Sequence, residues 1–167
     1  MSYGGSVVRP PVKLVHLDHL RRLRGSEQVA AVCYRVGKKG VEFLLVETRG
    51  GRWTFPKGSA EPGLTHAQAA ALEAFEEGGV HGRIEEAAFT QYVRRKETRG
   101  IEILVHVHLC EVSWLDTPQE SGRNPRWFVT ERARRRLRED RNPEHGAQLE
   151  GVLERALVRI RRLSSSS

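Results

Sequence analysis

Residues 58–80 read GSAEPGLTHAQAAALEAFEEGGV, and this stretch decides how the rest of the chain is interpreted. Thr65 followed three residues later by Gln68 is the pattern of a capping box, in which each side chain bonds the backbone of the other residue. The alanine run that follows favours helix, and the glycine pair 78–79 is typical of a helix end. The stretch therefore predicts a short helix over about residues 66–77, preceded by a glycine-rich loop.

Three carboxylates, Glu73, Glu76 and Glu77, share one arc of this predicted helix. The opposite arc carries small residues that suit close packing against a sheet, namely Ala67, Ala70, Ala71 and Ala74. Neighbouring carboxylates repel each other and raise one another's pKa, so such a cluster commonly marks a bound cation. Oxygen ligands are those that Mg²⁺ and Mn²⁺ prefer. A divalent-metal site is predicted on one face, and the alternative is a solvated acidic face.

The stretch resembles the signature of the Nudix hydrolase family. The residues that carry the resemblance are Gly58, Glu73, Glu76, Glu77, Gly79 and Val80. Two positions depart from the family pattern, because Leu64 and Leu72 replace a glutamate and an arginine that form an ion pair in the family. Replacing both members of an ion pair by apolar groups is often neutral or stabilising, whereas losing one member leaves a charge unpaired. We therefore interpret the two leucines as compensating for each other.

The resemblance runs from about residue 28 to residue 163 and points within the family to the diphosphoinositol polyphosphate and diadenosine polyphosphate hydrolases. Three segments support it: WTFPKG (53–58), ESGRNPRWF (120–128) and NPEHGAQLEGVL (142–153). It implies an α/β fold of the Nudix type, an α/β/α sandwich with a mixed β-sheet, over residues 26–163. A basic extension would precede it over residues 1–25, and a mobile tail would follow over 164–167.

The resemblance also implies the chemistry. The carbonyl of Gly58 and the carboxylates of Glu76 and Glu77 would bind Mg²⁺ or Mn²⁺, and Glu73 would be a further ligand or help to activate water. The ion would neutralise a diphosphate and lower the pKa of the water that attacks phosphorus. The three glutamates are thus the predicted catalytic residues. A further carboxylate is expected from a loop, with Asp116 and Glu120 as alternatives.

Substrate contacts are expected from basic residues. The chain has 28 Lys and Arg against 21 Asp and Glu, and this formal net charge of +7 favours polyanionic partners. Arg52 and Lys57 precede the predicted metal helix, and Arg123 lies in a segment resembling the polyphosphate hydrolases, so these three are predicted to bind substrate. Arg94 and Arg141 are further candidates. For each, a solvated surface position is the alternative.

Apolar patterning predicts strands in four runs, over residues 28–36, 41–48, 82–94 and 101–112. The first two should form a hairpin, and the last two should be joined by a polar turn. Within the last run, His106 and His108 point the same way; a metal site there is a minority alternative because a third ligand is not evident. A short strand over 126–130, a basic helix over 131–139 and an amphipathic helix from Asn142 complete the chain.

Cys33 and Cys110 lie in apolar runs and are predicted to be buried thiols in a cytoplasmic protein, with no membrane segment. The leading function is metal-dependent hydrolysis of a pyrophosphate bond in a highly phosphorylated small molecule, either a dinucleoside polyphosphate or an inositol pyrophosphate. One alternative is an RNA 5′-end pyrophosphohydrolase, although no aromatic platform for single-stranded nucleic acid is evident. The other is a non-catalytic Nudix-fold module that binds polyanions. The oligomeric state stays open.

Overall fold

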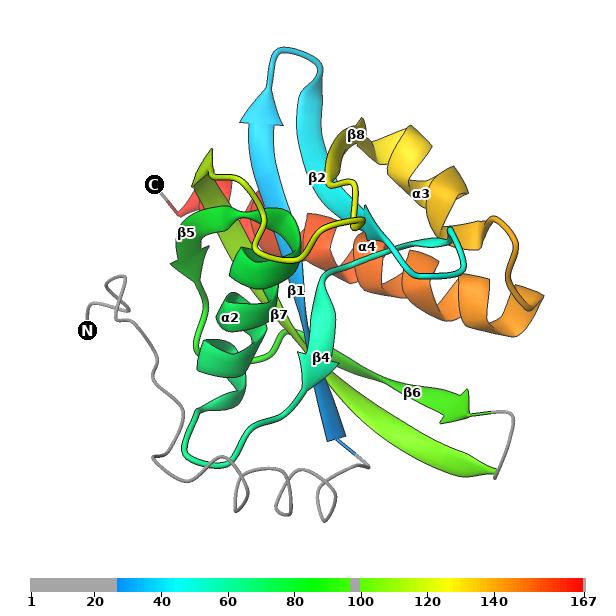
Figure 1. Ribbon diagram of the computed structural model, residues 1–167. Coiled ribbons are helices and arrows are strands. Elements are labelled where there is room, and N and C mark those ends of the chain that lie inside the picture. Colours follow the sequence, from blue (N-terminus) through cyan, green and yellow to red (C-terminus); the bar gives the residue numbers. More distant parts are fainter. Residues whose placement is uncertain (1–26, 97–99, 167) are drawn as a thin grey trace.

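The computed structural model describes residues 27–96 and 100–166, and the predicted basic extension over residues 1–25 therefore lies outside the described residues (Figure 1). In chain order the elements are β1 (Glu27–Gly37), β2 (Gly40–Glu47), β3 (Trp53–Thr54), β4 (Lys57–Ser59), α2 (His66–Gly78), β5 (Val80–Ile84), β6 (Thr90–Lys96), β7 (Ile101–Leu115), β8 (Arg126–Val129), α3 (Thr130–Arg138) and α4 (Pro143–Ser165). In this part of the chain, no helix is both long enough and apolar enough to cross a membrane.

The strands form one mixed sheet in the order β3-β2-β1-β7-β5, with β4 beside β1, β6 beside β7 and β8 beside β2. β1 and β7 run parallel, and their neighbours pair antiparallel. The predicted hairpin is confirmed, with Gly37 opposite Gly40 at its turn. The single strand predicted over 82–94 is wrong: β5 pairs with the end of β7 and β6 with its beginning. The intervening residues 85–89, EEAAF, include glutamate and alanine, which strands disfavour.

Helices cover both faces of the sheet, as the predicted α/β/α sandwich requires (Figure 1). Alternate residues of β1 serve the two layers, because successive side chains of a strand point to opposite faces. Val29, Ala31 and Cys33 pack with the buried alanines of α2. Ala30 and Val32 belong to the larger core under α3 and α4. α2 is therefore held directly against the centre of the sheet.

The C-terminal helix is longer than predicted. α4 continues to Ser165, so Ser164 and Ser165, which we predicted to begin the tail, form its last turn. Both hydroxyls donate hydrogen bonds to backbone carbonyls four residues earlier, those of Ile160 and Arg161. These local bonds let serine complete a helix end.

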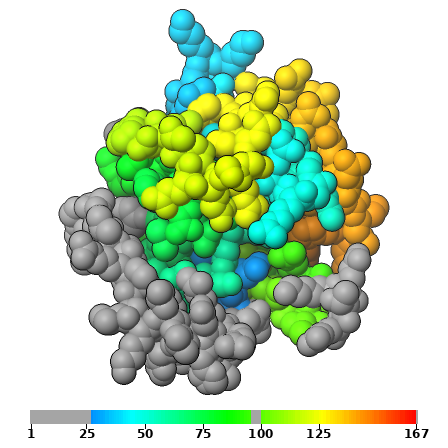
Figure 2. All heavy atoms as spheres, viewed as in Figure 1, coloured from blue at the N-terminus to red at the C-terminus, as the bar shows by residue number. Residues whose placement is uncertain are grey.

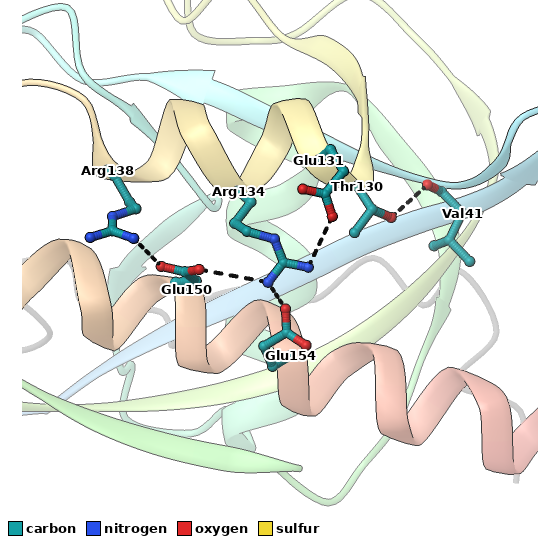
Figure 3. A network of polar contacts seen from close by, with 7 residues as sticks. All are labelled: Val41, Thr130, Glu131, Arg134, Arg138, Glu150 and Glu154. Atoms are coloured by element: carbon teal, nitrogen blue, oxygen red, sulfur yellow. Dashed lines mark hydrogen bonds and ion pairs between the residues drawn. The ribbon is translucent and has the colours of Figure 1, made fainter.

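The arginine run of α3 ties the two helices of this layer together (Figure 3). Arg134 contacts Glu154 and lies 3.7 Å from Glu150 and 3.4 Å from Glu131. Arg138 reaches the other oxygen of Glu150 at 2.9 Å. The packing of α3 on α4 thus accounts for Arg134 without a bound phosphate.

Candidate active site

The position of α2 is set at both of its ends. The Thr65 hydroxyl accepts a bond from the Gln68 amide at 3.1 Å, and the Gln68 side chain accepts one from the Thr65 amide at 2.9 Å. This confirms the predicted capping box. At the other end Gly79 adopts a left-handed conformation (φ 68°), and its N–H donates to the Phe75 carbonyl. The helix therefore extends one residue beyond its predicted end, to Gly78.

Gly58 lies directly against the first carboxylate of the helix. It sits in β4 opposite Val29 of β1, in the layer of strands on which α2 packs. A Cβ atom built on Gly58 would overlap the carboxyl group of Glu73. Only glycine lets this backbone and this carboxylate meet, as expected where a backbone approaches a ligand site closely. The structure thus brings together two residues separated by 15 positions in the sequence.

The carboxylates of α2 are more buried than an exposed acidic face would be. Glu77 is only 3% exposed and belongs to the buried side of the helix together with Ala69, whereas Ala71 is half-buried. Our division of α2 into an acidic face and an alanine face was therefore too simple. The Glu77 carboxylate accepts a long bond, 3.4 Å, from the Lys57 backbone amide. The strand before the helix thus contacts its last carboxylate.

Burial and like charge together hold a proton in this cluster. The pKa of Glu73 is raised to about 9 by burial first, then by the charge of and hydrogen bond with Glu77, and by the charges of Glu76 and Glu120. Burial also raises the pKa of Glu77, against the opposing effects of its bond with Glu73 and of Arg123. Such carboxylates become fully ionised only when a positive charge compensates them. An oxygen-only donor set of this kind fits a divalent cation.

The loop between β7 and β8 supplies one further carboxylate to the cluster. The Glu120 amide donates to the Glu76 carbonyl at 2.9 Å, and the Glu120 charge raises the pKa of Glu73. Asp116 is also fixed to α2, through a 2.7 Å bond from its amide to the Gly79 carbonyl. Its carboxylate, however, lies beside His81 at 3.8 Å. Between the two alternatives, Glu120 is the one whose charge acts on the glutamates.

Arg123 is a cation whose charge acts on Glu77. Its Nε donates to Glu120 Oε2 at 3.0 Å, and its Nη1 donates to the Glu47 carbonyl at 3.4 Å. The same residues line an open pocket of about 460 Å³, whose full lining is Glu47, Arg49, Gln119, Glu120, Ser121, Gly122 and Arg123. Figure 2 shows the segments around residues 50 and 120 side by side on one face of the molecule. Arg123 thus stands between the acidic cluster and this pocket.

A group of cations continues from the other side of Lys57. Burial lowers the pKa of Lys57 to about 8, with Arg94, Arg141 and Arg123 lowering it further and Glu77 opposing them. Arg141 is itself affected by burial and then by Arg52 and Arg94, all of which lower its pKa. Like charges gathered at this density repel one another unless an anion lies among them. The group therefore has the character of an anion site.

Of the predicted substrate residues, Lys57 and Arg123 interact electrostatically with Glu77, and Arg52 interacts with Arg141. Our preference for Arg52 over Arg94 followed distance along the sequence. In space, Arg94 acts on Lys57 directly, because it lies two residues from the buried Tyr92 in β6 and faces the same side of the sheet. The twofold period of a strand gives this orientation, since Tyr92 is buried and its neighbours Gln91 and Val93 are exposed.

Sequence reasoning missed His145, in the first turn of α4. Burial lowers the pKa of its imidazole, and Arg141, Arg94 and Lys57 lower it further. Its Nδ1 lies 3.4 Å from the Gln148 side-chain oxygen. A neutral imidazole therefore borders the cation group. A histidine one turn into an amphipathic helix carries no local signal of this role.

Comparison with known proteins decides the family. The profile of the NUDIX domain matches residues 26–150. The chain belongs to the Nudix hydrolase family. It is 31% identical over 128 residues to the human (Homo sapiens) diphosphoinositol polyphosphate phosphohydrolase 3-beta, an alignment that covers 75% of this chain and 76% of the relative. As a Nudix hydrolase, the chain is placed among the pyrophosphohydrolases, and metal binding is typical of the family.

Solved structures share the Nudix fold. A NUDIX hydrolase from Nitrosomonas europaea superposes with a TM-score of 0.64 and 23% identity, covering 80% of this chain and 88% of that chain. An Ap4A hydrolase from C. elegans gives a TM-score of 0.59 and 24% identity, covering 81% of this chain and 98% of that chain. These similarities confirm the predicted mixed sheet with flanking helices.

Proposed function

We propose that this Nudix hydrolase cleaves a pyrophosphate bond in a highly phosphorylated small molecule, either a dinucleoside polyphosphate or an inositol pyrophosphate, with Mg²⁺ or Mn²⁺ as the cofactor. The observation that carries the proposal is the position of Lys57 between two clusters of opposite charge. Its backbone amide bonds Glu77 of the acidic cluster, and its ammonium shares an electrostatic environment with Arg94 and Arg141. A ligand with adjacent phosphates matches this arrangement, because one phosphate could contact a metal ion at the acidic cluster while another contacts the cations.

The acidic cluster would hold the divalent ion. The Gly58 carbonyl, Glu76 and Glu77 are the proposed ligands, and Glu73 would be a further ligand or help to activate water. The ion, when bound, supplies compensation for phosphate charge and lowers the pKa of a water molecule. The contact between Gly58 and the Glu73 carboxylate supports this assignment, because it fixes the carboxylate against the backbone whose carbonyl would share the ion.

The cations would grip phosphates that are not being cleaved. Lys57, Arg52 and Arg123 are the proposed substrate residues, and the environment of Lys57 adds Arg94 and Arg141. Two of the guanidinium groups are held before any ligand binds: Arg123 by Glu120, and Arg141 by a 2.9 Å bond to the Leu137 carbonyl. Preorganised forks of this kind suit phosphate oxygens and hold the substrate for attack.

The substrate class is further supported by the names of similar proteins, which include diphosphoinositol polyphosphate phosphohydrolases and Ap4A hydrolase. A cytoplasmic location belongs to the same proposal. Cys33 and Cys110 are buried free thiols, which suits a reducing compartment.

The test is release of phosphate-containing products from a panel of diadenosine polyphosphates, inositol pyrophosphates, nucleoside triphosphates and 5′-triphosphate RNA. Each is assayed with Mg²⁺, with Mn²⁺ and with chelator. Glu76→Gln and Glu77→Gln remove one proposed ligand charge each, and we expect both to abolish metal-dependent turnover. The matched control is Glu86→Gln, since Glu86 is an exposed carboxylate outside the cluster.

Turnover of one of the first two substrate groups that needs both the metal and the two glutamates would support the proposal. Turnover of the 5′-triphosphate RNA alone would instead favour the alternative function, an RNA 5′-end pyrophosphohydrolase. Binding of a polyanion without turnover of any substrate would favour the non-catalytic module. Turnover unchanged in chelator would contradict the assignment of the acidic cluster.

A further inference from the structure

A second group of metal-ligating side chains lies at the start of α2, away from the glutamates. Glu27 is the first residue of β1, His66 is the first residue of α2, and His106 is in β7. One potential ligand atom from each lies within 4.8 Å of the others. The starts of α2 and β1 lie toward the same end of the molecule in Figure 1. The tertiary structure therefore supplies two partners for His106 that sequence reasoning lacked.

The distances within the group match those between ligands on one ion. The Glu27 Oε2 atom lies 3.3 Å from His66 Nε2 and 3.5 Å from His106 Nε2. Both exceed the usual length of an N–H···O hydrogen bond, about 2.7–3.2 Å. In tetrahedral coordination with bonds of about 2.0–2.1 Å, neighbouring ligand atoms are separated by about 3.3–3.4 Å. The three atoms are thus spaced as two edges of such a site.

The state of His106 gives a second, independent indication. Its side chain is 12% exposed, and its Nε2 atom is buried without a hydrogen-bond partner among the described residues. Leaving a buried polar atom unsatisfied is costly, and such an atom commonly marks the place of a bound water or ion. Its Nδ1 atom lies 3.0 Å from the Gln91 side-chain amide. Metal-bound histidines are commonly held by a hydrogen bond at the second ring nitrogen, and rotation of the amide presents an oxygen there.

The neighbouring histidine on the same strand face does not belong to the group. His108 is 2% exposed, and its Nδ1 lies 3.0 Å from the Glu85 carbonyl. His66 instead stacks on His106, with ring centroids 4.1 Å apart and ring planes at 24°. Both Nε2 atoms lie near the same carboxylate. Because the lone pair of an imidazole lies in its ring plane and these planes are nearly parallel, one ring would turn when both bind the same ion. The predicted alternative, a pair of His106 and His108, is therefore replaced by a pair drawn from different elements.

We propose that Glu27, His66 and His106 form a binding site for a transition-metal ion of the Zn²⁺ class, with water completing its coordination. Imidazole and carboxylate ligands suit zinc, whereas the oxygen-only glutamate cluster suits Mg²⁺ or Mn²⁺. The site is separate from that cluster, because His66 precedes Glu73 by seven residues, about 10 Å along the helix axis. Glu27 and His66 are 39% and 38% exposed, so an ion has access from solvent.

A metal at this position would join β1, β7 and the first turn of α2. Because the same helix carries the proposed catalytic glutamates in its second half, the ion would stabilise the element that presents them. An ion that binds only the folded protein raises its unfolding temperature. The site is therefore proposed to be structural, and binding can be measured without any turnover assay.

The test uses Zn²⁺ and Co²⁺ on the full chain carrying Glu76→Gln and Glu77→Gln, which removes two of the glutamate charges that would compete for the ion. Equilibrium dialysis measures Zn²⁺, and visible absorption measures Co²⁺, which absorbs more strongly with a tetrahedral nitrogen-containing ligand set than with six oxygens. In this background we compare His66→Ala and Glu27→Gln with His81→Ala. The control residue His81 is a histidine of similar exposure, 36%, outside the group.

We expect one Zn²⁺ per chain that is lost, or bound at least tenfold more weakly, in His66→Ala and in Glu27→Gln. The Co²⁺ absorption should disappear in the same two proteins and remain in His81→Ala. Zn²⁺ should raise the unfolding temperature only where the three ligands are intact. Glu27→Gln keeps the size of the side chain, so a folding failure of His66→Ala does not leave the test undecided. Equal Zn²⁺ binding and equal Co²⁺ absorption in all of these proteins would overturn the proposal.

Discussion

The carboxyl group of Glu73 in α2 lies against the backbone of Gly58 in β4, in the position that a Cβ atom on residue 58 would take. The contact joins the loop before the helix to the first of the three carboxylates. The metal-binding role proposed for this pair therefore depends on a missing side chain as much as on a charged one.

Gly58→Ala should displace Glu73 and lower metal-dependent turnover by about 10²-fold or more, because small misplacements of reacting groups have effects of that size. Because the added methyl meets only the flexible end of the Glu73 side chain, stability should change little. Gly151→Ala, within α4, is the matched control, and it should stabilise by about 0.5–1 kcal/mol since its Cβ meets only the end of the Arg155 side chain. Steady-state kinetics and chemical denaturation measure both effects. Unchanged kcat in Gly58→Ala would disprove the role of the contact.

Glu73 should make the metal-free protein less stable as pH rises. Its pKa in the folded protein is about 9 against an ordinary value of 4.5, so between these values the folded state holds a proton that the unfolded state lacks. Raising pH through this window therefore favours unfolding. Unfolding temperatures recorded in chelator from pH 6 to 9 should fall, and Glu73→Gln should flatten the fall. An undiminished slope in Glu73→Gln, with Glu86→Gln as the control, would contradict the assigned pKa.

Arg141→Gln and Arg94→Gln should raise KM for a polyphosphorylated substrate by about tenfold or more each, because a hydrogen bond to a charged group contributes about 1.5–3 kcal/mol. The control is Arg132→Gln, an exposed arginine of α3. Both variants should lose more affinity for inorganic tripolyphosphate than for phosphate, since the cations of the group act together. Titration calorimetry separates this binding effect from catalysis. Equal tripolyphosphate affinity in Arg141→Gln, Arg94→Gln and Arg132→Gln would show that the cation group does not bind the substrate.

Leu64 and Leu72 should behave as a compensated pair. Leu64 packs with the apolar residues beneath α2, and Leu72 is half-buried in that helix. Leu64→Glu alone and Leu72→Arg alone should each destabilise the fold, by about 1–3 kcal/mol if the new charge is left without a partner. The double variant should recover part of the loss and change activity modestly. A double-mutant cycle measures the interaction energy. Strictly additive effects would refute the compensation.

Arg134→Ala should reduce stability by about 0.5–1 kcal/mol without changing KM, because its ion pairs join α3 to α4 and lie outside the cation group. Arg135→Ala removes a neighbouring exposed arginine and should have a smaller effect. The comparison is made by urea denaturation at low and high salt. A large rise in KM in Arg134→Ala would instead assign this arginine to substrate binding.

The sequence alone predicted the features that depend on neighbours along the chain. The capping box of Thr65 and Gln68, the glycine end of α2 and the hairpin between β1 and β2 are local, and short-range backbone geometry determines them. The twofold period of a strand predicted that His106 and His108 share one face of β7. The spacing of Gly58 and the three glutamates was sufficient for the family. The one local feature named above that the sequence analysis missed was the break between β5 and β6.

Only the tertiary structure decided which charges meet. The structure distinguishes Glu120 from Asp116, because the Glu120 charge acts on Glu73. It also shows that Arg94 and His145 interact with Lys57. Sheet pairing and helix packing bring these residues together although they are far apart in the chain. His106 acquired Glu27 and His66 as partners for the same reason, through the parallel pairing of β1 with β7 and the seating of α2 on them. Periodicity indicates the face on which a side chain lies. The packing of that face against other elements determines its neighbours, and electrostatic and coordination chemistry depend on those neighbours.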